Sequence, residues 1–277
     1  MVSRIPVSAS LLCLVILVQS CTKHNDTPAA PPPNDLVETT PPFQKGHTLF
    51  INNYISGYYD ALPAHYSVTT KKYPVIIYLH GGGQVGDGDK DLPLVLNDGV
   101  AKEIAAQKFP ANVVVNGENF SFIVLSPQMR ATPPDSMVWN FIQFALQHYR
   151  IDESRIYISG LSMGGVLTTE LGGKYTSKLA AISPMAGESF GDDKTVNAQH
   201  IAQGNLPMWD FHNSDDPSIP ASTAVDFVNL VNSFSPGTPP RLTIFKAVGH
   251  DAWTAALDPN YRENNKNLYE WMLQYKR

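Results

Sequence analysis

Cysteine is nearly absent from this 277-residue sequence, and no block of like charge interrupts it. The two cysteines, Cys13 and Cys21, both lie near the N-terminus. No disulfide can therefore join distant parts of the remaining chain, and no cysteine-based zinc site is possible there. The formal net charge of −5 comes without a basic cluster. This argues against electrostatic binding of nucleic acid or of an anionic membrane surface.

The N-terminal apolar segment is too short to span a bilayer comfortably. This segment, Leu11–Val18, follows Arg4 and is followed in turn by Ser20 and Cys21. A short positive region, an apolar run and a small residue before cysteine resemble a bacterial lipobox. Gln19 departs from the lipobox pattern because it is a less usual residue at its position.

The lipobox resemblance implies a lipoprotein signal peptide at residues 1–20 and a lipid on Cys21 that anchors the chain to the cell envelope. It favours the outer membrane over the inner and leaves the membrane face open. An ordinary signal peptide or an uncleaved anchor is the alternative. Residues 21–45 are polar and proline-rich, which predicts an extended tether. The predicted domain then covers residues 46–277, long enough for one large core.

Short apolar runs alternate with helical patterns over this predicted domain. Six runs predict strands: Val75–Leu79, Phe122–Leu125, Ile156–Ile158, Leu179–Ile182, Met208–Phe211 and Leu242–Phe245. Apolar residues at helical spacing predict two core-facing helices, over 138–149 and 268–275. Continuous apolarity suits strands that are buried on both faces. The sequence therefore predicts an α/β fold with a mostly parallel central sheet and helices on both faces.

One pentapeptide combines a chemical group with a demanding backbone. Gly160-Leu161-Ser162-Met163-Gly164 follows a predicted strand and precedes a helix-like stretch. Strand, sharp turn and helix around G-x-S-x-G are typical of the nucleophile elbow of an α/β-hydrolase. The strained turn projects the serine hydroxyl above the sheet, and side chains at both glycine positions would clash with neighbouring strands. The pattern predicts Ser162 as a nucleophile.

A serine hydroxyl needs a base, which is usually a histidine held in one tautomer by a carboxylate. Three histidines follow Ser162, and His250 comes just after the last predicted strand, where this fold places its base. We interpret His200 as a surface residue. We interpret His212 as a structural residue at the end of its strand.

The candidate acid lies after the penultimate predicted strand, where two aspartates compete. Asp216 precedes Pro217, which biases its backbone away from helix and toward an extended conformation. We favour Asp216 as the partner of the histidine base. Asp215 is the alternative, and the aspartate that is not used would be a solvated loop charge.

The oxyanion hole is predicted from the glycines that follow the first predicted strand. In His80-Gly81-Gly82-Gly83, backbone N–H groups can approach a substrate closely. Together with the N–H of Met163, that of Gly82, or of Gly83 as second choice, would donate to an oxyanion. We expect His80 to brace this loop, and a plain glycine turn is the alternative interpretation.

An acidic loop has the rhythm of a calcium site. Asp87-Gly88-Asp89-Lys90-Asp91 alternates carboxylates, but the next residue is Leu92, where an EF-hand requires glycine. We interpret the segment as a solvated loop, with calcium binding as the alternative. The sequence predicts no metal and no cofactor.

These motifs together resemble a known group of proteins. The chain is similar to bacterial esterases related to polyhydroxybutyrate depolymerases, feruloyl esterases and acetyl xylan esterases, at the dienelactone-hydrolase end of the α/β-hydrolases. The matching stretches are YLHGGG (78–83), LNDG (96–99), FIVLSPQ (122–128), RIYISGLSMGG (155–165), FHNSDDPSIP (211–220) and VGHDAW (248–253). The resemblance implies Asp216 as the acid, because the acid of these esterases precedes one proline and comes shortly before another, here Pro220. Asn213 departs from the glycine often found at its position.

The resemblance implies a serine carboxylic ester hydrolase that acts through an acyl-enzyme. Its expected substrates are feruloyl or acetyl groups on plant polysaccharide. The short segment between Gly187 and Leu206 leaves no room for a large lid, and an open site suits polymer side groups. One alternative is a serine peptidase of the prolyl-oligopeptidase type, although the chain lacks a propeller domain. The other is a non-catalytic binding lipoprotein. The oligomeric state is left open.

Overall fold

The computed structural model describes residues 36–189 and 193–277. The expected signal peptide, the lipidation site Cys21 and the first part of the tether lie outside the described residues. Over the part of the chain that is described, no helix combines the length and the apolarity needed to cross a membrane.

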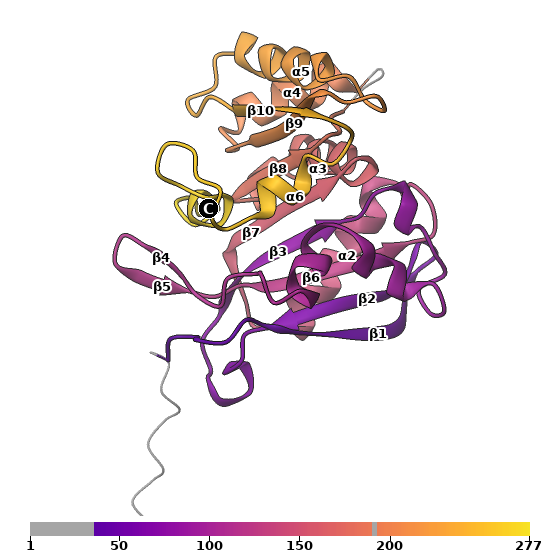
Figure 1. Cartoon of the computed structure of the whole chain (residues 1–277), viewed down its shortest axis with the longest axis vertical. Helices are drawn as coiled ribbons and strands as arrows, with labels where there is room; N and C mark the ends of the chain where they lie inside the picture. Colours follow the sequence, from indigo (N-terminus) through magenta and orange to yellow (C-terminus); the bar gives the residue numbers. More distant parts are fainter. Residues whose placement is uncertain (1–35, 190–192) are drawn as a thin grey trace, which may run out of the picture. The chain divides into compact units, whose positions relative to one another are not determined.

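Eight strands form one mixed sheet in the order β1-β2-β6-β3-β7-β8-β9-β10, which Figure 1 shows from the indigo strands at the bottom to the orange strands at the top. From β6 to β10 all neighbouring strands are parallel, whereas β1 and β2 run antiparallel at one edge. The strands of this sheet are β1 (Phe43–Asn52), β2 (Ile55–Leu62), β3 (Tyr73–Leu79), β6 (Ile123–Met129), β7 (Ile151–Leu161), β8 (Ala181–Met185), β9 (Trp209–Asp215) and β10 (Arg241–Val248). A separate hairpin consists of β4 (Val113–Val115) and β5 (Glu118–Phe120).

All six predicted strands are confirmed, as β3 and β6 to β10. The antiparallel pair β1 and β2 was not predicted. β1 is mostly exposed and mixes polar with apolar residues, so it has no continuous apolar run. It begins at Phe43, and the buried carboxylate of Glu38 lies 2.8 Å from the ring nitrogen Nδ1 of His65. Packed structure therefore begins before residue 46, where the sequence placed the start of the domain.

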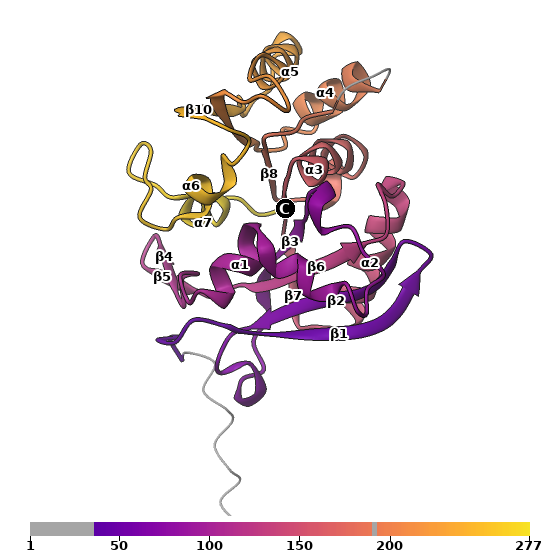
Figure 2. The same cartoon turned by 45° about the vertical axis from the view of Figure 1, so that its right-hand side comes forward.

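Helices cover both faces of the sheet. The α-helices are α1 (Gly99–Ala105), α2 (Asp135–His148), α3 (Met163–Lys174), α4 (Lys194–Gln203), α5 (Ser222–Ser233), α6 (Trp253–Leu257) and α7 (Leu268–Met272). Four short 3-10 turns are η1 (Tyr66–Val68), η2 (Gly82–Gln84), η3 (Leu92–Asn97) and η4 (Thr176–Lys178). Figure 2 shows α1, α6 and α7 on the left and α2, α3 and α4 on the right. The predicted helix over 138–149 is confirmed as α2, whereas the C-terminal helix ends at Met272, earlier than expected.

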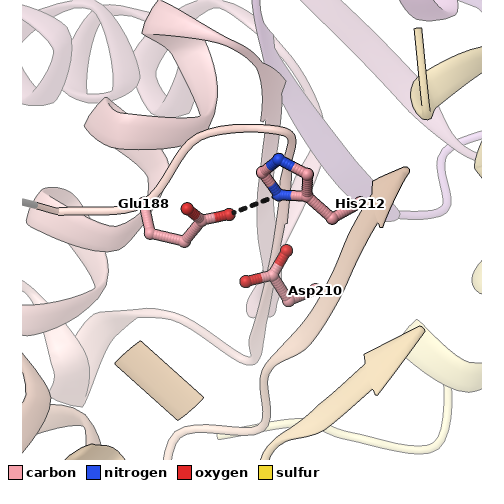
Figure 3. A group of neighbouring side chains, drawn as sticks. All are labelled: Glu188, Asp210 and His212. Atoms are coloured by element: carbon pink, nitrogen blue, oxygen red, sulfur yellow. Dashed lines mark hydrogen bonds and ion pairs between the residues drawn. The ribbon is translucent and has the colours of Figure 1, made fainter. Parts of the chain in front are cut away.

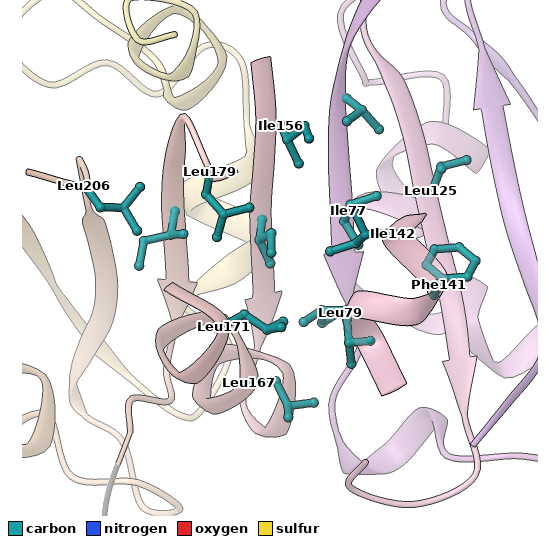
Figure 4. Packing of buried hydrophobic residues seen from close by; sticks show 14 of the residues in the cluster. Ile77, Leu79, Leu125, Phe141, Ile142, Ile156, Leu167, Leu171, Leu179 and Leu206 are labelled. Atoms are coloured by element: carbon teal, nitrogen blue, oxygen red, sulfur yellow. The ribbon is translucent and has the colours of Figure 1, made fainter. Parts of the chain in front are cut away.

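Two hydrophobic cores lie on opposite faces of the sheet, because successive side chains of a strand point in opposite directions. Ile77 and Leu79 of β3 pack into the core with α2 to α5, shown in Figure 4. Ile76 and Tyr78 of the same strand pack into the core with α1, α6 and α7. Between β8 and β9 the chain forms α4, which packs on α3 and α5.

The core around α2 provides a test of this packing. Phe141 is fully buried, whereas Phe50 of β1 is 69% exposed. We expect Phe141→Ala to lower the free energy of unfolding by about 3–5 kcal/mol because it leaves a cavity. Phe50→Ala, the matched control, should change that free energy by less than about 0.5 kcal/mol. Denaturant unfolding of both variants measures the difference, and equal losses would contradict the described core.

Candidate active site

The candidate nucleophile lies at a strained turn between a strand and a helix. β7 ends at Leu161, α3 begins at Met163, and Ser162 between them has φ 53° and ψ −117°. A non-glycine residue rarely adopts such positive φ unless its surroundings hold it there. Here the N–H of Ser162 donates to the carbonyl oxygen of Met185 at 2.8 Å, and its own carbonyl accepts from the N–H of Val166 at 3.0 Å. The backbone on both sides therefore fixes the turn.

Two glycines make the close packing of this turn possible. A Cβ on Gly160 would lie 2.5 Å from the carbonyl oxygen of Gly164. A Cβ on Gly164 would lie 2.0 Å from the carbonyl oxygen of Leu79, at the end of β3. Both distances are far inside van der Waals contact, and the atoms in the way belong to backbone. The steric reason given for the two glycines from the sequence is thus confirmed.

The sheet topology collects the candidate residues at one edge. Ser162, Asp216 and His250 follow the ends of β7, β9 and β10, and the glycine loop follows the end of β3. These strands run parallel, so their carboxyl ends lie along the same edge.

The candidate acid and base are in direct contact. Nδ1 of His250 lies 2.6 Å from Oδ2 of Asp216. The Asp216 side chain is buried, while the His250 side chain is 23% exposed. Asp215 is exposed, and one of its oxygens accepts a hydrogen bond from the hydroxyl of Ser214 instead. Of the two aspartates weighed from the sequence, only Asp216 contacts the histidine.

The Asp216 carboxylate is also held by the backbone of its own loop. Its Oδ1 accepts from the N–H of Ser218 at 2.8 Å and from the N–H of Ile219 at 3.1 Å. Burial on its own would raise the pKa of Asp216, but the hydrogen bond with His250 and these two N–H donors hold the pKa below its ordinary value. The carboxylate is therefore charged at neutral pH and can orient the imidazole.

The glycine loop lies next to the candidate nucleophile. A Cβ placed on Gly81 would be 3.4 Å from Cβ of Ser162. Gly82 and Gly83 are exposed, and a Cβ on either would meet nothing within 4 Å. The backbone at these two positions is thus accessible to a ligand. Which of the two donates to an oxyanion stays a prediction, as does the role of Met163.

His80 braces this loop. Its ring nitrogen Nε2 accepts from the N–H of Met129 at 2.8 Å, so the N–H at Nδ1 donates to the carbonyl oxygen of Gly81 at 2.7 Å. Burial lowers the pKa of His80 to about 4, which keeps the ring neutral in this tautomer. The ring ties the loop to β6.

A chain of polar contacts joins the glycine loop to the candidate base. The N–H of Gly81 donates to Oε1 of Gln84 at 3.1 Å, and Nε2 of Gln84 donates to Asp98 at 3.3 Å. The other oxygen of Asp98 accepts from the indole N–H of Trp253 at 3.3 Å. The Trp253 ring packs edge-on against the imidazole of His250 with ring centres 5.3 Å apart. These contacts were not predicted from the sequence, although Asp98 and Trp253 lie in two of the matching stretches.

A buried group of three side chains, drawn in Figure 3, contacts Asp216 through His212. Glu188 follows β8, and Asp210 and His212 belong to β9. All three are at most 2% exposed. Nε2 of His212 lies 3.3 Å from Oδ2 of Asp216, and Nδ1 lies 3.2 Å from Oε1 of Glu188. Because β9 runs to Asp215, His212 lies inside its strand and not at its end, as the sequence had suggested. His212 also contacts the candidate acid.

The same three side chains are the one set of possible metal ligands found among residues 36–189 and 193–277. One ligand atom from each lies within 4.8 Å of the others.

The acidic loop at Asp87 is held by hydrogen bonds to its own backbone. Oδ1 of Asp87 accepts from the N–H groups of Asp89 and Asp91, at 2.8 and 3.1 Å. These two bonds lower the pKa of Asp87, so its carboxylate is stabilised by the backbone of its own loop. His200 is exposed, as expected.

Known proteins share this architecture. A family model described as phospholipase/carboxylesterase matches residues 64–259. A bifunctional acetylxylan esterase/xylanase from Neocallimastix patriciarum is 32% identical over 145 residues, which cover 52% of this chain and 19% of that protein. The structure of a thermostable esterase superposes with a TM-score of 0.59 at 21% identity, covering 86% of this chain and 64% of that one. A feruloyl esterase module from Clostridium thermocellum complexed with sinapinate gives 0.53 at 16% identity, covering 78% and 85%.

The parallel sheet, its covering helices and the serine at the strand–helix turn define an α/β-hydrolase. The chain belongs to the phospholipase/carboxylesterase family of these hydrolases, and it is an esterase of that family. It spans about a fifth of the length of the acetylxylan esterase/xylanase that it matches, at 19%. At their low identity, the solved structures show the fold alone.

The packing of the serine turn provides a test. We expect Gly164→Ala to destabilise the fold by about 3 kcal/mol, because its Cβ would overlap the backbone of β3. Gly82→Ala is the matched control, since its Cβ would meet nothing within 4 Å, and it should cost less than about 0.5 kcal/mol. Thermal unfolding followed by circular dichroism compares the two. A Gly164→Ala protein as stable as Gly82→Ala would refute the close approach of α3 to β3.

Proposed function

We propose that this esterase hydrolyses carboxylic esters through an acyl-enzyme on Ser162, with His250 as general base and Asp216 as the carboxylate that orients it. The observation that carries the proposal is the 2.6 Å contact between Nδ1 of His250 and Oδ2 of Asp216. A carboxylate acceptor at Nδ1 keeps the proton on that nitrogen. Nε2 is then left unprotonated and can accept a proton from a serine hydroxyl.

In the first half of the reaction, the Ser162 oxygen bonds to the ester carbonyl carbon while its proton passes to Nε2 of His250. The carbonyl oxygen becomes an oxyanion, which accepts hydrogen bonds from the N–H of Met163 and from the N–H of Gly82 or Gly83. The C–O bond to the alcohol then breaks, and the alcohol takes the proton from His250. The product is an acyl group on Ser162.

In the second half, water replaces the alcohol. His250 removes a proton from the water as its oxygen bonds to the acyl carbon, and the same oxyanion forms again. The bond to the Ser162 oxygen breaks, and the proton on His250 returns to that oxygen. The acid leaves and the free enzyme is restored. No cofactor and no metal take part in these proposed steps.

The proposed substrates are acetyl or feruloyl groups attached to plant polysaccharide. Similarity to an acetylxylan esterase/xylanase supports the acetyl group, and the fold shared with a feruloyl esterase module is compatible with the feruloyl group. The exposure of Gly82, Gly83 and part of His250 supports a site that a polymer side group can reach. Initial rates on p-nitrophenyl acetate, methyl ferulate and acetylated xylan test this proposal, with a peptide p-nitroanilide as control. Cleavage of the anilide alone would contradict it.

The role of Ser162 gives the first prediction for the reaction. We expect Ser162→Ala to lower kcat/KM for p-nitrophenyl acetate by at least about 1,000-fold, because the attacking oxygen is gone. The melting temperature should stay close to that of wild type. A fluorophosphonate probe should label wild type and leave the variant unlabelled. Activity within tenfold of wild type in the folded variant would sink the assignment.

The two neighbouring aspartates give a matched comparison. We expect Asp216→Asn to lower kcat by about 1,000-fold or more, because the amide cannot hold the imidazole in the required tautomer. Asp215→Asn should keep kcat within about twofold, since Asp215 is exposed and contacts Ser214. Steady-state kinetics on the same ester measures both. The reverse ranking would show that Asp215 is the acid.

A further inference from the structure

Three buried ionisable side chains lie together in Glu188, Asp210 and His212, hereafter the buried cluster. A buried space ordinarily holds fewer such groups. Figure 3 shows their polar ends facing one another, and Asp216 contacts the cluster through His212. A buried carboxylate without a partner is costly, so the protons in this space must be arranged to satisfy each group. The hydrogen-bond partners reveal that arrangement.

Both ring nitrogens of His212 face oxygen atoms. Nε2 lies 2.8 Å from the carbonyl oxygen of Ile219 and 3.3 Å from Oδ2 of Asp216. Both neighbours only accept, so Nε2 carries a proton. Nδ1 faces Oε1 of Glu188 at 3.2 Å. If Glu188 is ionised, Nδ1 must carry a proton too, and the ring is a cation between two carboxylates.

The two acids of the cluster differ in their hydrogen-bond donors. No side chain among the residues that the structure describes donates to either oxygen of Asp210, and the backbone N–H of Phe211 only partly stabilises this carboxylate. Glu188 is its polar neighbour, and Oε2 of Glu188 accepts from the hydroxyl of Thr223 at 2.8 Å. A proton on Asp210 resolves the deficit, because Asp210 then donates to the Glu188 carboxylate. Burial raises the pKa of Asp210 well above its ordinary value, and the negative charge of Glu188 raises it further.

We propose that Asp210 is neutral, Glu188 is an anion and His212 is a cation in the folded protein, and that Glu188 and His212 are positioning residues for Asp216. With these charges both ring nitrogens of His212 donate to acceptors, and one oxygen of Asp210 donates to Glu188. The acid of the proposed reaction then rests on a cation that is itself fixed by Glu188. This inference rests on the proposed function for its kinetic consequences, but not for the charges themselves.

The balance of effects on His212 agrees with this assignment. Burial alone would lower the pKa of His212, whereas the hydrogen bond and the charge of Glu188, with smaller contributions from Ile219 and Asp216, raise it overall. Among the described residues, the titratable side chains around it are Glu188 after β8, Asp210 of β9 and Asp216 after β9. Beyond Asp216 the next charged or titratable group is His250, which shares the same oxygen of Asp216.

The cation has a consequence for the reaction. A positive charge beside Asp216 partly offsets the attraction between that carboxylate and protonated His250. Loss of this charge would make protonation of the base easier, so activity would fail at a higher pH. It would also release Asp216 from one of its partners and loosen the orientation of the imidazole.

Two isosteric amide variants separate a charged from a neutral acid. Asp210→Asn mimics the neutral form and can still donate to Glu188, so kcat and KM should stay within about twofold of wild type. Glu188→Gln removes the anion, so His212 loses its extra proton. We expect kcat to fall about tenfold with KM unchanged within about twofold. The acid limb of the pH–rate profile should move up by about half a pH unit.

A purely structural role would lower stability in both variants without moving the acid limb. Equal kinetic effects of the two variants, an unmoved acid limb in Glu188→Gln, or a larger loss of kcat in Asp210→Asn would each overturn the proposal.

The pH dependence of unfolding provides a second measurement that needs no enzymatic activity. The raised pKa of Asp210 favours the folded state at acidic pH, and this contribution is lost as the pH rises through the folded-state pKa. As the pH rises above about 4, the ordinary pKa of an unfolded aspartate, Asp210→Asn should therefore lose less stability than wild type.

The charges can also be observed directly, whether or not the protein proves to be an esterase. Nitrogen-15 spectra of histidine-labelled protein, assigned with His212→Gln, should show both ring nitrogens of His212 protonated near neutral pH. Glu188→Gln should convert the ring to a neutral tautomer. An unprotonated Nδ1 in wild type would overturn the proposal. So would one divalent metal ion per purified chain that is lost in Asp210→Asn, because a metal would then neutralise the acids.

Discussion

The candidate active site depends on how closely the turn after β7 approaches the end of β3. The backbone of Gly164 packs against the carbonyl oxygen of Leu79, at a distance that excludes any side chain. This contact fixes α3 against the sheet and holds Ser162 in its strained conformation. It also brings the loop that begins at His80 beside the serine. The proposed nucleophile and the exposed backbone of Gly82 and Gly83 are thus placed together by backbone packing.

Asp216 is the second centre of organisation. Its two oxygens take four partners: two N–H groups of its own loop, His250 and His212. His212 belongs to β9 and His250 follows β10, so the carboxylate ties β9 to the loop after β10. Through His212 the same carboxylate reaches the buried cluster. The acid of the proposed reaction is therefore held by electrostatic contacts on every side, which suits a group that must orient a base without moving.

The sequence predicted those features that depend on local patterns. Continuous apolar runs predicted β3 and β6 to β10, and the two glycines around Ser162 predicted a turn that the structure explains sterically. Partly exposed strands such as β1 have no such run. Long-range contacts have no local signal either: Trp253 meets Asp98 from 155 residues away. A lone aspartate within the apolar run over 208–211 was the one clue to the buried cluster, and its partner Glu188 became visible only in three dimensions.

The proposed reaction transfers an acyl group to Ser162. The most direct measurement mixes the enzyme with a chromogenic acetyl ester, quenches with acid within milliseconds, and examines the digested protein by mass spectrometry. We expect an acetyl group on the peptide that contains Ser162, formed as fast as the first alcohol is released. Turnover with no acyl group on the enzyme, or with the acyl group on another residue, would contradict it.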